Sequence, residues 1–392
     1  MSVPYCLNIH PGESLAAVRE AITTHARAVK AAVSPDAPYP LGLRLAEAAV
    51  RELVEPAALD SFRALLAEYD LYATAINGFP YGVFHGAPVK TEVYRPDWTA
   101  PERLSYTACL AKVLAAILPE GFAGNVSTVP LGYKGAGVGR QESDVLYARQ
   151  LAIMAEFLHD LKERTGREIV LALEPEPDCL LENTADVVAW FEDVFLYEGR
   201  RWLAARRRHT PEEAEALLRR YVGVCLDTCH FAVAFEDPLA ALLRFESASL
   251  RVARIQLSAA VRAMVTDASL KRLAAFVDPV YLHQTKIRLP RSRIQAFPDL
   301  TPETLEAARQ YPGCELRTHF HVPLFFGGDD TLGSTRVDLT PAFFAHADSR
   351  GYPLEIETYT FDVLPPELRP GSVVESLVKE TRWVQAALPT RR

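Results

Sequence analysis

The stretch VCLDTCHFAV, Val224 to Val233, begins with an apolar run and ends with an acid and an imidazole only a few residues further on. Its first three residues have the composition of a buried strand, whereas Asp227 and His230 are of types that seldom lie in a core without a partner. In α/β proteins the functional side chains gather at the carboxyl ends of the strands. The stretch therefore predicts a strand that builds a wall and ends in a site.

Short β-type runs alternate with longer helical patterns along the whole chain. The strand candidates are Tyr5 to Ile9, Leu41 to Leu45, Tyr72 to Ile76, Asn125 to Val129, Ile169 to Leu173, Val222 to Leu226, Val252 to Leu257 and Leu354 to Glu357. Apolar residues at i, i+3 and i+4 predict helices over Leu15 to Val33, Pro101 to Leu118, Leu146 to Arg164, Ala185 to Tyr197 and Pro238 to Phe245. Eight such repeats predict an α/β fold of the (β/α)₈ or TIM barrel type.

Two further stretches carry helix-start chemistry. Thr210-Pro211-Glu212-Glu213 combines a hydroxyl cap, a proline at the first helical position and a glutamate three residues after the cap, which is a capping box. Thr301-Pro302-Glu303 repeats the cap and the proline, and its acid favours the positive end of a helix. Both stretches predict a helix that begins at the proline.

A doubly wound open sheet is the rival architecture, since it also alternates strand and helix. No G-x-G-x-x-G motif follows the first strand candidate, which disfavours that fold. Polar residues stand at or just after the carboxyl ends of nearly every strand candidate: Asn8, His10, Arg44, Asn77, Glu174, Asp227, Gln256 and Glu357. In a barrel these positions converge on one mouth, so the pattern favours a barrel.

The longest departure from the repeat lies between the seventh and eighth strands, from about Ser258 to Gly351. It contains a helix-like segment, Ser269 to Phe276, the basic run KIRLPRSR and the run CELRTHFHVPLFFGG. Structureless loops of this length are uncommon in compact domains. We therefore expect a long ordered excursion over the mouth, and, because no linker or repeat is visible, a single domain over residues 1–392.

Composition narrows the function classes. The chain has 392 residues, of which 49% are hydrophobic, and 42 Lys and Arg against 50 Asp and Glu leave a formal charge of −8, which disfavours nucleic acid as a partner. No apolar run approaches the roughly 20 residues needed to span a bilayer, so no membrane insertion is expected. Six cysteines without a C-x-x-C pair, and an amino terminus without signal-peptide order, predict reduced thiols and a cytoplasmic protein.

The polar strand ends form a metal-binding pattern. Alternation favours Glu174 and Glu357 over Glu176 and Glu355 as the inward members of their pairs, although either register fits the pattern. Together with Asp227 they place three carboxylates in one mouth, where like charges raise one another's pKa and a divalent cation would relieve the repulsion.

The donor types leave the metal open. Glu174, Asp227 and Glu357, with the carbonyl of Gln256 as a fourth ligand, suit Mn²⁺ or Mg²⁺. Adding imidazoles shifts the preference toward Zn²⁺, Co²⁺ or Mn²⁺, and the candidates are His230, His319 and His321.

The motif VCLDTCH resembles the sixth-strand motif of the xylose isomerase-like TIM barrel superfamily, which includes sugar isomerases and epimerases and the endonuclease IV type of AP endonuclease (AP endonuclease family 2). The resemblance implies that Asp227 binds a metal and that His230 lies in or near the metal site. The order of polar residues is similar along the chain: Glu174, Gln256, the pair His319 and His321, and Glu357.

More narrowly, five motifs resemble the EboE branch, whose members are described as metabolite traffic proteins: YCLNIHPGES, INGFPYGVFHG, VYRPDW, LEPEPDCLLENT and RTHFHVPLF. This resemblance implies a bacterial gene cluster with membrane prenyltransferase-like and sugar-phosphate-cyclase-like neighbours, but no reaction. Two departures stand out. Gln256 occupies a position where the superfamily often has histidine, and the ends INGF and STVPLG lack the histidines that hold a multinuclear zinc cluster in the endonucleases, which argues against DNA cleavage.

The leading hypothesis is a metal-dependent isomerase or epimerase of a sugar, a cyclitol or a related phosphate. Glu174 and Glu357 would act as ligands and as the acid and base that remove and return a proton. The candidates for binding hydroxyl groups of the substrate are Asn8, His10, Asn77 and His85. A phosphate group would be bound by Lys134 in GYKGAGVGR, or by Lys286 and Arg288.

Two alternatives remain. One is a metal-dependent phosphodiesterase or AP endonuclease, for which the basic run RRWLAARRRH, Arg200 to His209, is the candidate surface, although its helical spacing suits a solvated helix face. The other is a binding or trafficking protein that keeps the barrel without the chemistry. Converging acids argue against that alternative, and Gln256 argues for it.

Overall fold

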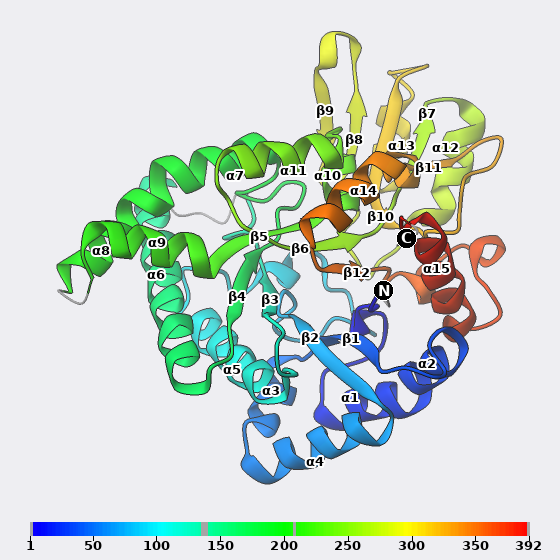
Figure 1. The fold of residues 1–392 in the computed structure, drawn as a ribbon. Helices are drawn as coiled ribbons and strands as arrows, with labels where there is room; N and C mark the ends of the chain where they lie inside the picture. The colour runs from blue at the N-terminus through cyan, green and yellow to red at the C-terminus, as the bar shows by residue number, and fades with distance from the viewer. Residues whose placement is uncertain (1–2, 135–139, 207–208, 390–392) are drawn as a thin grey trace.

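The computed structural model describes residues 3–134, 140–206 and 209–389. Its main sheet is parallel, with the strand order β1-β2-β3-β4-β5-β6-β12, and Figure 1 shows it curled into a barrel with helices around the outside. The strands are β1 (Tyr39–Arg44), β2 (Leu71–Asn77), β3 (Gly124–Thr128), β4 (Ile169–Leu173), β5 (Val222–Asp227), β6 (Val252–Leu257) and β12 (Leu354–Ile356). The predicted α/β barrel is confirmed.

The eighth position of the barrel is filled by two residues near the amino terminus. Tyr5 pairs in parallel with Ile356 of β12, and Cys6 pairs in parallel with Gly42 of β1. The amide of Cys6 donates to the carbonyl of Ile356 at 2.8 Å, and the amide of Gly42 donates to the carbonyl of Tyr5 at 3.1 Å. These bonds join the two edges of the sheet and close the ring.

The prediction of a strand from Tyr5 to Ile9 was therefore too long. The chain turns into a 3₁₀ segment at Leu7–Ile9, because β12 offers only three residues for pairing and the side chain of Asn8 turns inward to donate to Glu357 at 2.6 Å. The other seven predicted strands agree with the observed bounds to within two residues.

The strands form where continuous apolar runs can be buried on both faces, which is typical of parallel sheets covered by helices. All five residues of β4 and all six of β5 are buried. Inside the barrel, one layer beneath the mouth, the guanidinium of Arg254 lies 3.1 Å from the carboxylate of Glu355, and both side chains are almost fully buried. Glu355 therefore also lies in the barrel interior, although the prediction favoured only Glu357 of this pair as inward, because residues two apart on a strand share one face.

Helices cover the barrel on its outer side (Figure 1). Their bounds are α1 (Leu15–Ala21), α2 (Arg27–Val33), α3 (Glu47–Leu53), α4 (Pro56–Glu68), α5 (Pro101–Ile117), α6 (Arg140–Thr165), α7 (Thr184–Trp190), α8 (Leu196–Ala205), α9 (Pro211–Tyr221), α10 (Thr228–Val233), α11 (Pro238–Ser247), α14 (Pro341–Arg350) and α15 (Val373–Ala387). The predicted capping box is present, since the Thr210 hydroxyl accepts from the amide of Glu213 and the Glu213 carboxylate accepts from the amide of Thr210.

The segment between β6 and β12 forms a second, antiparallel sheet with the order β11-β7-β10-β8-β9. Its elements are β7 (Ala260–Met264), α12 (Asp267–Leu273), β8 (Thr285–Arg288), β9 (Ile294–Phe297), α13 (Pro302–Ala308), β10 (Glu315–His321) and β11 (Gly333–Ser334). Figure 1 shows this sheet standing at one end of the barrel. It brings β10, with its two histidines, to the carboxyl ends of the barrel strands.

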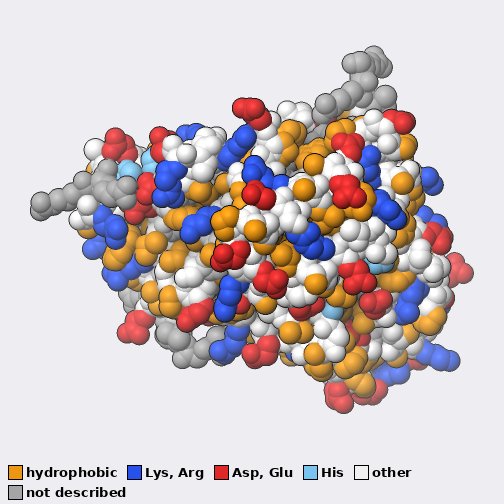
Figure 2. Space-filling model, turned by 90° about the horizontal axis from the view of Figure 1, so that it is seen from below, with side chains coloured by type: hydrophobic (Ala, Val, Ile, Leu, Met, Phe, Trp, Pro, Cys, Tyr) orange, Lys and Arg blue, Asp and Glu red, His pale blue; other side chains and the backbone are white. Residues whose placement is uncertain are grey.

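The surface adds little to the question of partners. Figure 2 shows acidic and basic side chains interspersed on the face seen from below. Two arginines of the predicted basic run lie on α8 and are paired, Arg200 with Glu215 and Arg201 with Glu198, while 207–208 of that run lie outside the described residues. None of the described helices is both long and apolar enough to cross a bilayer. All six cysteines are free thiols.

Gly42 of β1 pairs with Cys6 where the barrel closes, here called the barrel seam, and it lies close to the carboxylate of Glu355. A Cβ at Gly42 would overlap the carboxylate of Glu355, so Gly42→Ala should displace a buried, ion-paired side chain and lower the free energy of unfolding by about 1–3 kcal/mol. Urea unfolding followed by circular dichroism measures this. The control is Gly82→Ala, where nothing lies within 4 Å of the added Cβ. Equal stability of the two variants would contradict the tight packing at the seam.

Candidate metal centre

Three buried carboxylates converge at the mouth of the barrel. Glu174 follows β4, Asp227 ends β5 and Glu357 follows β12, with exposed fractions of 3%, 0% and 4%. A ligand oxygen of each lies within 4.8 Å of those of the other two. One oxygen of each carboxylate, Oε2 of both glutamates and Oδ2 of Asp227, has no hydrogen-bond partner in the structure. Because unpartnered buried carboxylate oxygens are unfavourable, this donor set fits a bound cation.

Hydrogen-bond donors hold the other oxygens of two of these carboxylates. Oδ1 of Asp227 accepts from the amides of Cys229 and His230 and, at 2.6 Å, from the hydroxyl of Ser258. Asp227 is thus the N-cap of α10 while its second oxygen stays available. Oε1 of Glu357 accepts from the side-chain amides of Asn8 at 2.6 Å and Asn77 at 3.1 Å. Each acid is oriented by one oxygen and presents the other to the centre.

Burial and repulsion change the protonation of these acids. Burial raises the pKa of Glu174 to about 7, with Asp227 adding to the rise and His230 opposing it. Burial also raises the pKa of Glu357 well above its ordinary value, and Glu174 and Asp227 add to that rise. Without a cation the three groups cannot all stay ionised near neutral pH, and a divalent ion would reverse this.

Three histidines surround the carboxylates, one on α10 and two on β10. Each Nδ1 contacts a carbonyl oxygen, which can only accept: His230 that of Pro175 at 2.8 Å, His319 that of the Gln284 side chain at 2.7 Å and His321 that of Glu357 at 2.8 Å. Each Nδ1 therefore carries the proton, and Nε2 of a neutral ring carries a lone pair. Such outer contacts to carbonyls are typical of metal-binding imidazoles.

Two of these lone pairs face each other. Nε2 of His319 and Nε2 of His321 lie 3.1 Å apart, and burial lowers the pKa of His321 to about 4 and that of His319 well below its ordinary value. Both rings are therefore neutral near pH 7, and no proton is available to join the two nitrogens. An electron-pair acceptor bound between them would remove the repulsion, which fits a cation.

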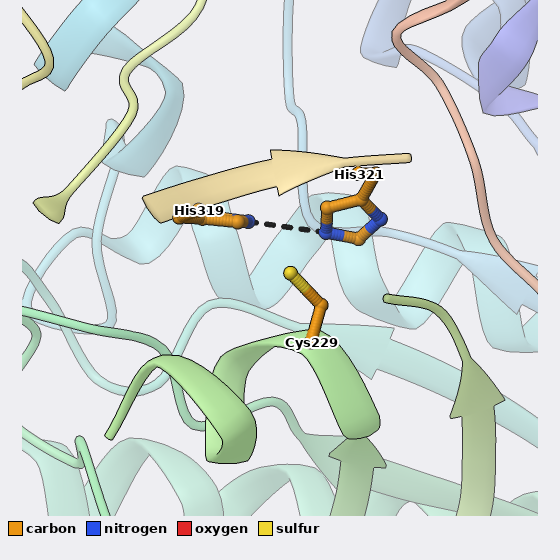
Figure 3. Close-up of side chains that lie close together, drawn as sticks. All are labelled: Cys229, His319 and His321. Carbon is orange, nitrogen blue, oxygen red and sulfur yellow. Dashed lines mark hydrogen bonds between the residues drawn. The ribbon is translucent and has the colours of Figure 1, made fainter. Parts of the chain in front are cut away.

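Two further side chains that could bind a metal ion in this cluster were not among the predicted ligands. Glu176 groups with His230 and His319, and the thiol of Cys229 groups with His319 and His321. Figure 3 shows that thiol pointing from α10 toward the two imidazoles on β10. The alternation of side chains along a strand favoured Glu174 over Glu176 as the inward residue. This alternation does not extend to Glu176, because β4 ends at Leu173. Cys229 was interpreted as a small buried hydrophobe, and burial does hold the pKa of its thiol well above the ordinary value.

A hydrogen-bonded chain links Glu176 to the second sheet. The hydroxyl of Tyr94 donates to Glu176 at 2.7 Å, and the amide of Gln284 donates to the hydroxyl of Tyr94 at 2.7 Å. The carbonyl of Gln284 in turn accepts from His319. Tyr94 and Gln284 were also absent from the prediction, since nothing in their local sequence signals a contact between segments 190 residues apart.

A pocket opens beside the carboxylates, and its empty space, including the part open to solvent, is about 520 Å³. Of the residues predicted to bind substrate, Asn8 and Asn77 line it, together with Glu174, Glu176 and Glu357. Its remaining lining comprises Phe79, Pro80, Phe84, Val89, Lys90, Val93, Tyr94, His230, Tyr281, Leu282, His319 and Tyr359.

Comparisons with known proteins identify the architecture. No protein-family model and no curated protein matches the sequence. Among solved structures, the probable 3-DHS dehydratase AsbF of Bacillus anthracis, involved in petrobactin synthesis, has 12% identity and a TM-score of 0.51 over 98% of this chain and 99% of its own. A xylose isomerase-like TIM barrel protein from Mycobacterium smegmatis in complex with magnesium has 13% identity and a TM-score of 0.51 over 99% and 98%. The chain folds as a xylose isomerase-like TIM barrel.

At these identities the similarity concerns the fold alone, which is that of the TIM barrel. No comparison of sequences supports the narrower resemblance to the EboE branch.

Two of the residues predicted to bind substrate, His10 and His85, do not line the pocket. His10 contacts the hydroxyl of Tyr5 at 3.2 Å and stacks on His25, and burial lowers its pKa to about 3. His85 donates from Nε2 to the backbone carbonyl of Asn8 at 2.7 Å. In these positions both histidines support the chain that carries Asn8.

The predicted phosphate-binding cations are engaged elsewhere. Lys134 and Lys286 both pair with the carboxylate of Glu182, and burial lowers the pKa of Lys286 to about 8. Arg288 pairs with Glu315 at 2.5 Å. None of the three lines the pocket, and 135–139 of the glycine-rich stretch after Lys134 lie outside the described residues. The structure thus gives no support to a phosphate site built from these side chains.

Gln256 lies beside Asp227 in the register of β5 and β6. Its side-chain carbonyl accepts from the thiol of Cys225 at 2.8 Å, whereas its amide nitrogen is buried without a partner. An amide nitrogen is a donor and does not bind metal ions. The role of the Gln256 carbonyl as a fourth metal ligand stays a prediction.

Metal binding at this centre should release protons, because burial holds the pKa of Glu174 at about 7 and raises that of Glu357 further. We expect the affinity for Mn²⁺, measured by titration calorimetry, to rise from about pH 6 to about pH 8, with protons released on binding.

Asp227→Asn should abolish stoichiometric binding while keeping the helix cap, since asparagine also caps helices. The control is Asp36→Asn on an exposed turn. A pH-independent affinity, or full binding by Asp227→Asn, would show that the carboxylates are not the ligands.

Proposed function

We propose that this protein is a divalent-metal-dependent isomerase or epimerase of a small polyhydroxylated hydroxy-carbonyl compound. One observation carries the proposal: three buried carboxylates at the barrel mouth each have an unpartnered oxygen, and their ligand oxygens lie within 4.8 Å of one another. These carboxylates need a cation, and they lie at the floor of a pocket with space for a small molecule. Such an arrangement suits metal-assisted proton transfer.

The roles of the acids follow from their environments. A bound divalent cation would polarise the carbonyl and hydroxyl oxygens of the substrate. Glu174, which lines the pocket, suits an acid and base that takes a proton from the neighbouring carbon and returns it. Glu357, held by Asn8 and Asn77, would serve on the opposite side of the substrate.

The histidines and Glu176 have a second role in this proposal. A ring nitrogen of His230 and one of His319 lie within 4.8 Å of a carboxylate oxygen of Glu176, and all three residues line the pocket. They would bind the same ion, a second ion, or the oxygens of the substrate. Oxygen ligands favour Mg²⁺ or Mn²⁺ and the imidazoles favour Zn²⁺, Co²⁺ or Mn²⁺. The magnesium of the Mycobacterium smegmatis protein of similar fold agrees with the oxygen-rich set.

A place in a bacterial metabolite pathway rests on the EboE-like motifs alone. We keep it as a proposal because those motifs are long and include pocket residues, among them Asn8, Asn77 and Glu176. No observation in the structure favours phosphodiester cleavage over isomerisation.

The proposal predicts metal-dependent exchange of a substrate carbon-bound proton with solvent. Protein loaded with Mn²⁺, Mg²⁺, Zn²⁺ or Co²⁺ is incubated in D₂O with a panel of ketoses and cyclic polyhydroxyketones, and loss of the C–H signal is followed by proton NMR. Glu174→Gln and Glu357→Gln should each slow exchange by about 100-fold or more, since they remove the proton-transferring groups.

The control for this experiment is Glu212→Gln on the exposed face of α9, which should exchange at the parent rate. Stoichiometric metal without exchange of any panel member would favour the binding-protein alternative over the enzyme.

A further inference from the structure

The pocket above the carboxylates has two chemically different parts. Its floor carries the acids, the imidazoles and the two asparagines, whereas its upper wall is built from Phe79, Phe84, Val89, Val93 and Leu282, with the rings of Tyr281 and Tyr359 beside them. The isomerase proposal accounts for the floor only. The wall requires a reason of its own, because a sugar has hydroxyl groups at every carbon.

One side of the wall is a cluster of three rings from distant segments. The ring centroids of Phe84, Tyr281 and Tyr359 lie 5.1 to 5.2 Å apart, in tilted and edge-to-face arrangements. Phe84 follows β2, Tyr281 precedes β8 and Tyr359 follows β12. Three loops of the mouth thus converge to build one aromatic surface, and such surfaces bind apolar groups.

The hydroxyl of Tyr281 is not available to a ligand. His85 donates from Nε2 to a backbone carbonyl, so its Nδ1 accepts, and the hydroxyl of Tyr281 donates to that Nδ1 at 2.8 Å. Across the pocket the hydroxyl of Tyr94 is likewise engaged by Glu176. Both tyrosines therefore offer ring surface, and the distal hydroxyl groups of a plain sugar would face this wall without partners, which is unfavourable.

The pocket also lacks a cation for a phosphate. Among the residues that the structure describes, Lys90 is the only lysine or arginine that lines the pocket. Its ammonium donates to the carbonyls of Asp278 at 3.0 Å and Tyr281 at 2.7 Å and pairs with Asp299 at 2.6 Å. These three acceptors use the three donors of an ammonium group. The described lining therefore offers no free lysine or arginine to a phosphate group.

We propose that the substrate carries an uncharged apolar group, an aromatic ring or a branched hydrocarbon, beside its hydroxy-carbonyl unit, and that this wall binds that group. The inference rests on the proposed function, because the hydroxy-carbonyl unit is placed over the carboxylates. It predicts that compounds with such a group bind more tightly than plain sugars and sugar phosphates.

Hydroxamates test the wall separately from the metal centre, because a hydroxamate binds metal ions through two oxygens as a hydroxy-carbonyl compound does. Calorimetric titration of the metal-loaded protein with acetohydroxamate, benzohydroxamate and phosphonoacetohydroxamate compares a methyl, a phenyl and a charged substituent. We expect benzohydroxamate to bind about tenfold or more tightly than acetohydroxamate, since burying a phenyl ring is favourable. The phosphonate should bind no better than the methyl compound.

Each outcome has a separate meaning. Equal affinity for the methyl and phenyl compounds, or tighter binding of the phosphonate, overturns the apolar wall while leaving the metal centre in place. Failure of all three to bind metal-loaded protein contradicts the proposed function itself.

Variants of the wall residues test whether the wall causes the preference for benzohydroxamate over acetohydroxamate. Phe84→Ala should reduce the preference for the phenyl compound to about threefold or less, without changing the affinity for acetohydroxamate. Val93→Ala, at a half-buried position in the pocket lining, should reduce it in the same direction and decides the question if Phe84→Ala loses its metal. The matched control is Phe122→Ala, a phenylalanine that is 50% exposed and does not line the pocket. A full preference in both wall variants overturns the proposal.

Discussion

The mutual repulsion of three buried carboxylates is the constraint on which the rest of the mouth depends. Glu174, Asp227 and Glu357 lie where water cannot screen them, and only protons or a cation can offset their charge. The structure satisfies the outward oxygens of Asp227 and Glu357 with donors and leaves the inward ones unpartnered. The barrel must be closed for this arrangement to exist, because Glu357 follows the strand that the amino-terminal pair Tyr5 and Cys6 joins to β1.

Local chain geometry lets single residues serve two purposes. Asp227 caps a helix of six residues with one oxygen and faces the centre with the other. The cap starts α10 directly at the strand end, and this places the imidazole of His230 three residues later over the same mouth. The second sheet contributes in a different way. Its strand β10 departs from regular pairing with β7 between Thr318 and His321, and His319 and His321 project from one face of it toward the carboxylates.

The pocket combines a floor that needs a cation with a wall of apolar side chains. Placing charged ligands beneath aromatic rings lowers the local dielectric constant, which strengthens every electrostatic interaction in the site. The same burial explains why the acids have raised pKa values and the paired imidazoles lowered ones. A ligand that reaches the floor must displace water from the wall, so the two parts of the pocket act together on binding.

The sequence by itself determined the eight-fold alternation, seven strand positions, the helix caps and the placing of Glu174, Asp227 and Glu357 at strand ends. These features follow from local periodicity and from residues close together in the chain. Only the tertiary structure decided that Glu176 and Cys229 join the cluster, that Glu182 engages both Lys134 and Lys286, and that rings from three loops form one wall. The reason is physical: hydrogen bonds, ion pairs and ring contacts form between side chains that the fold brings together from far apart, and no periodic pattern records such contacts.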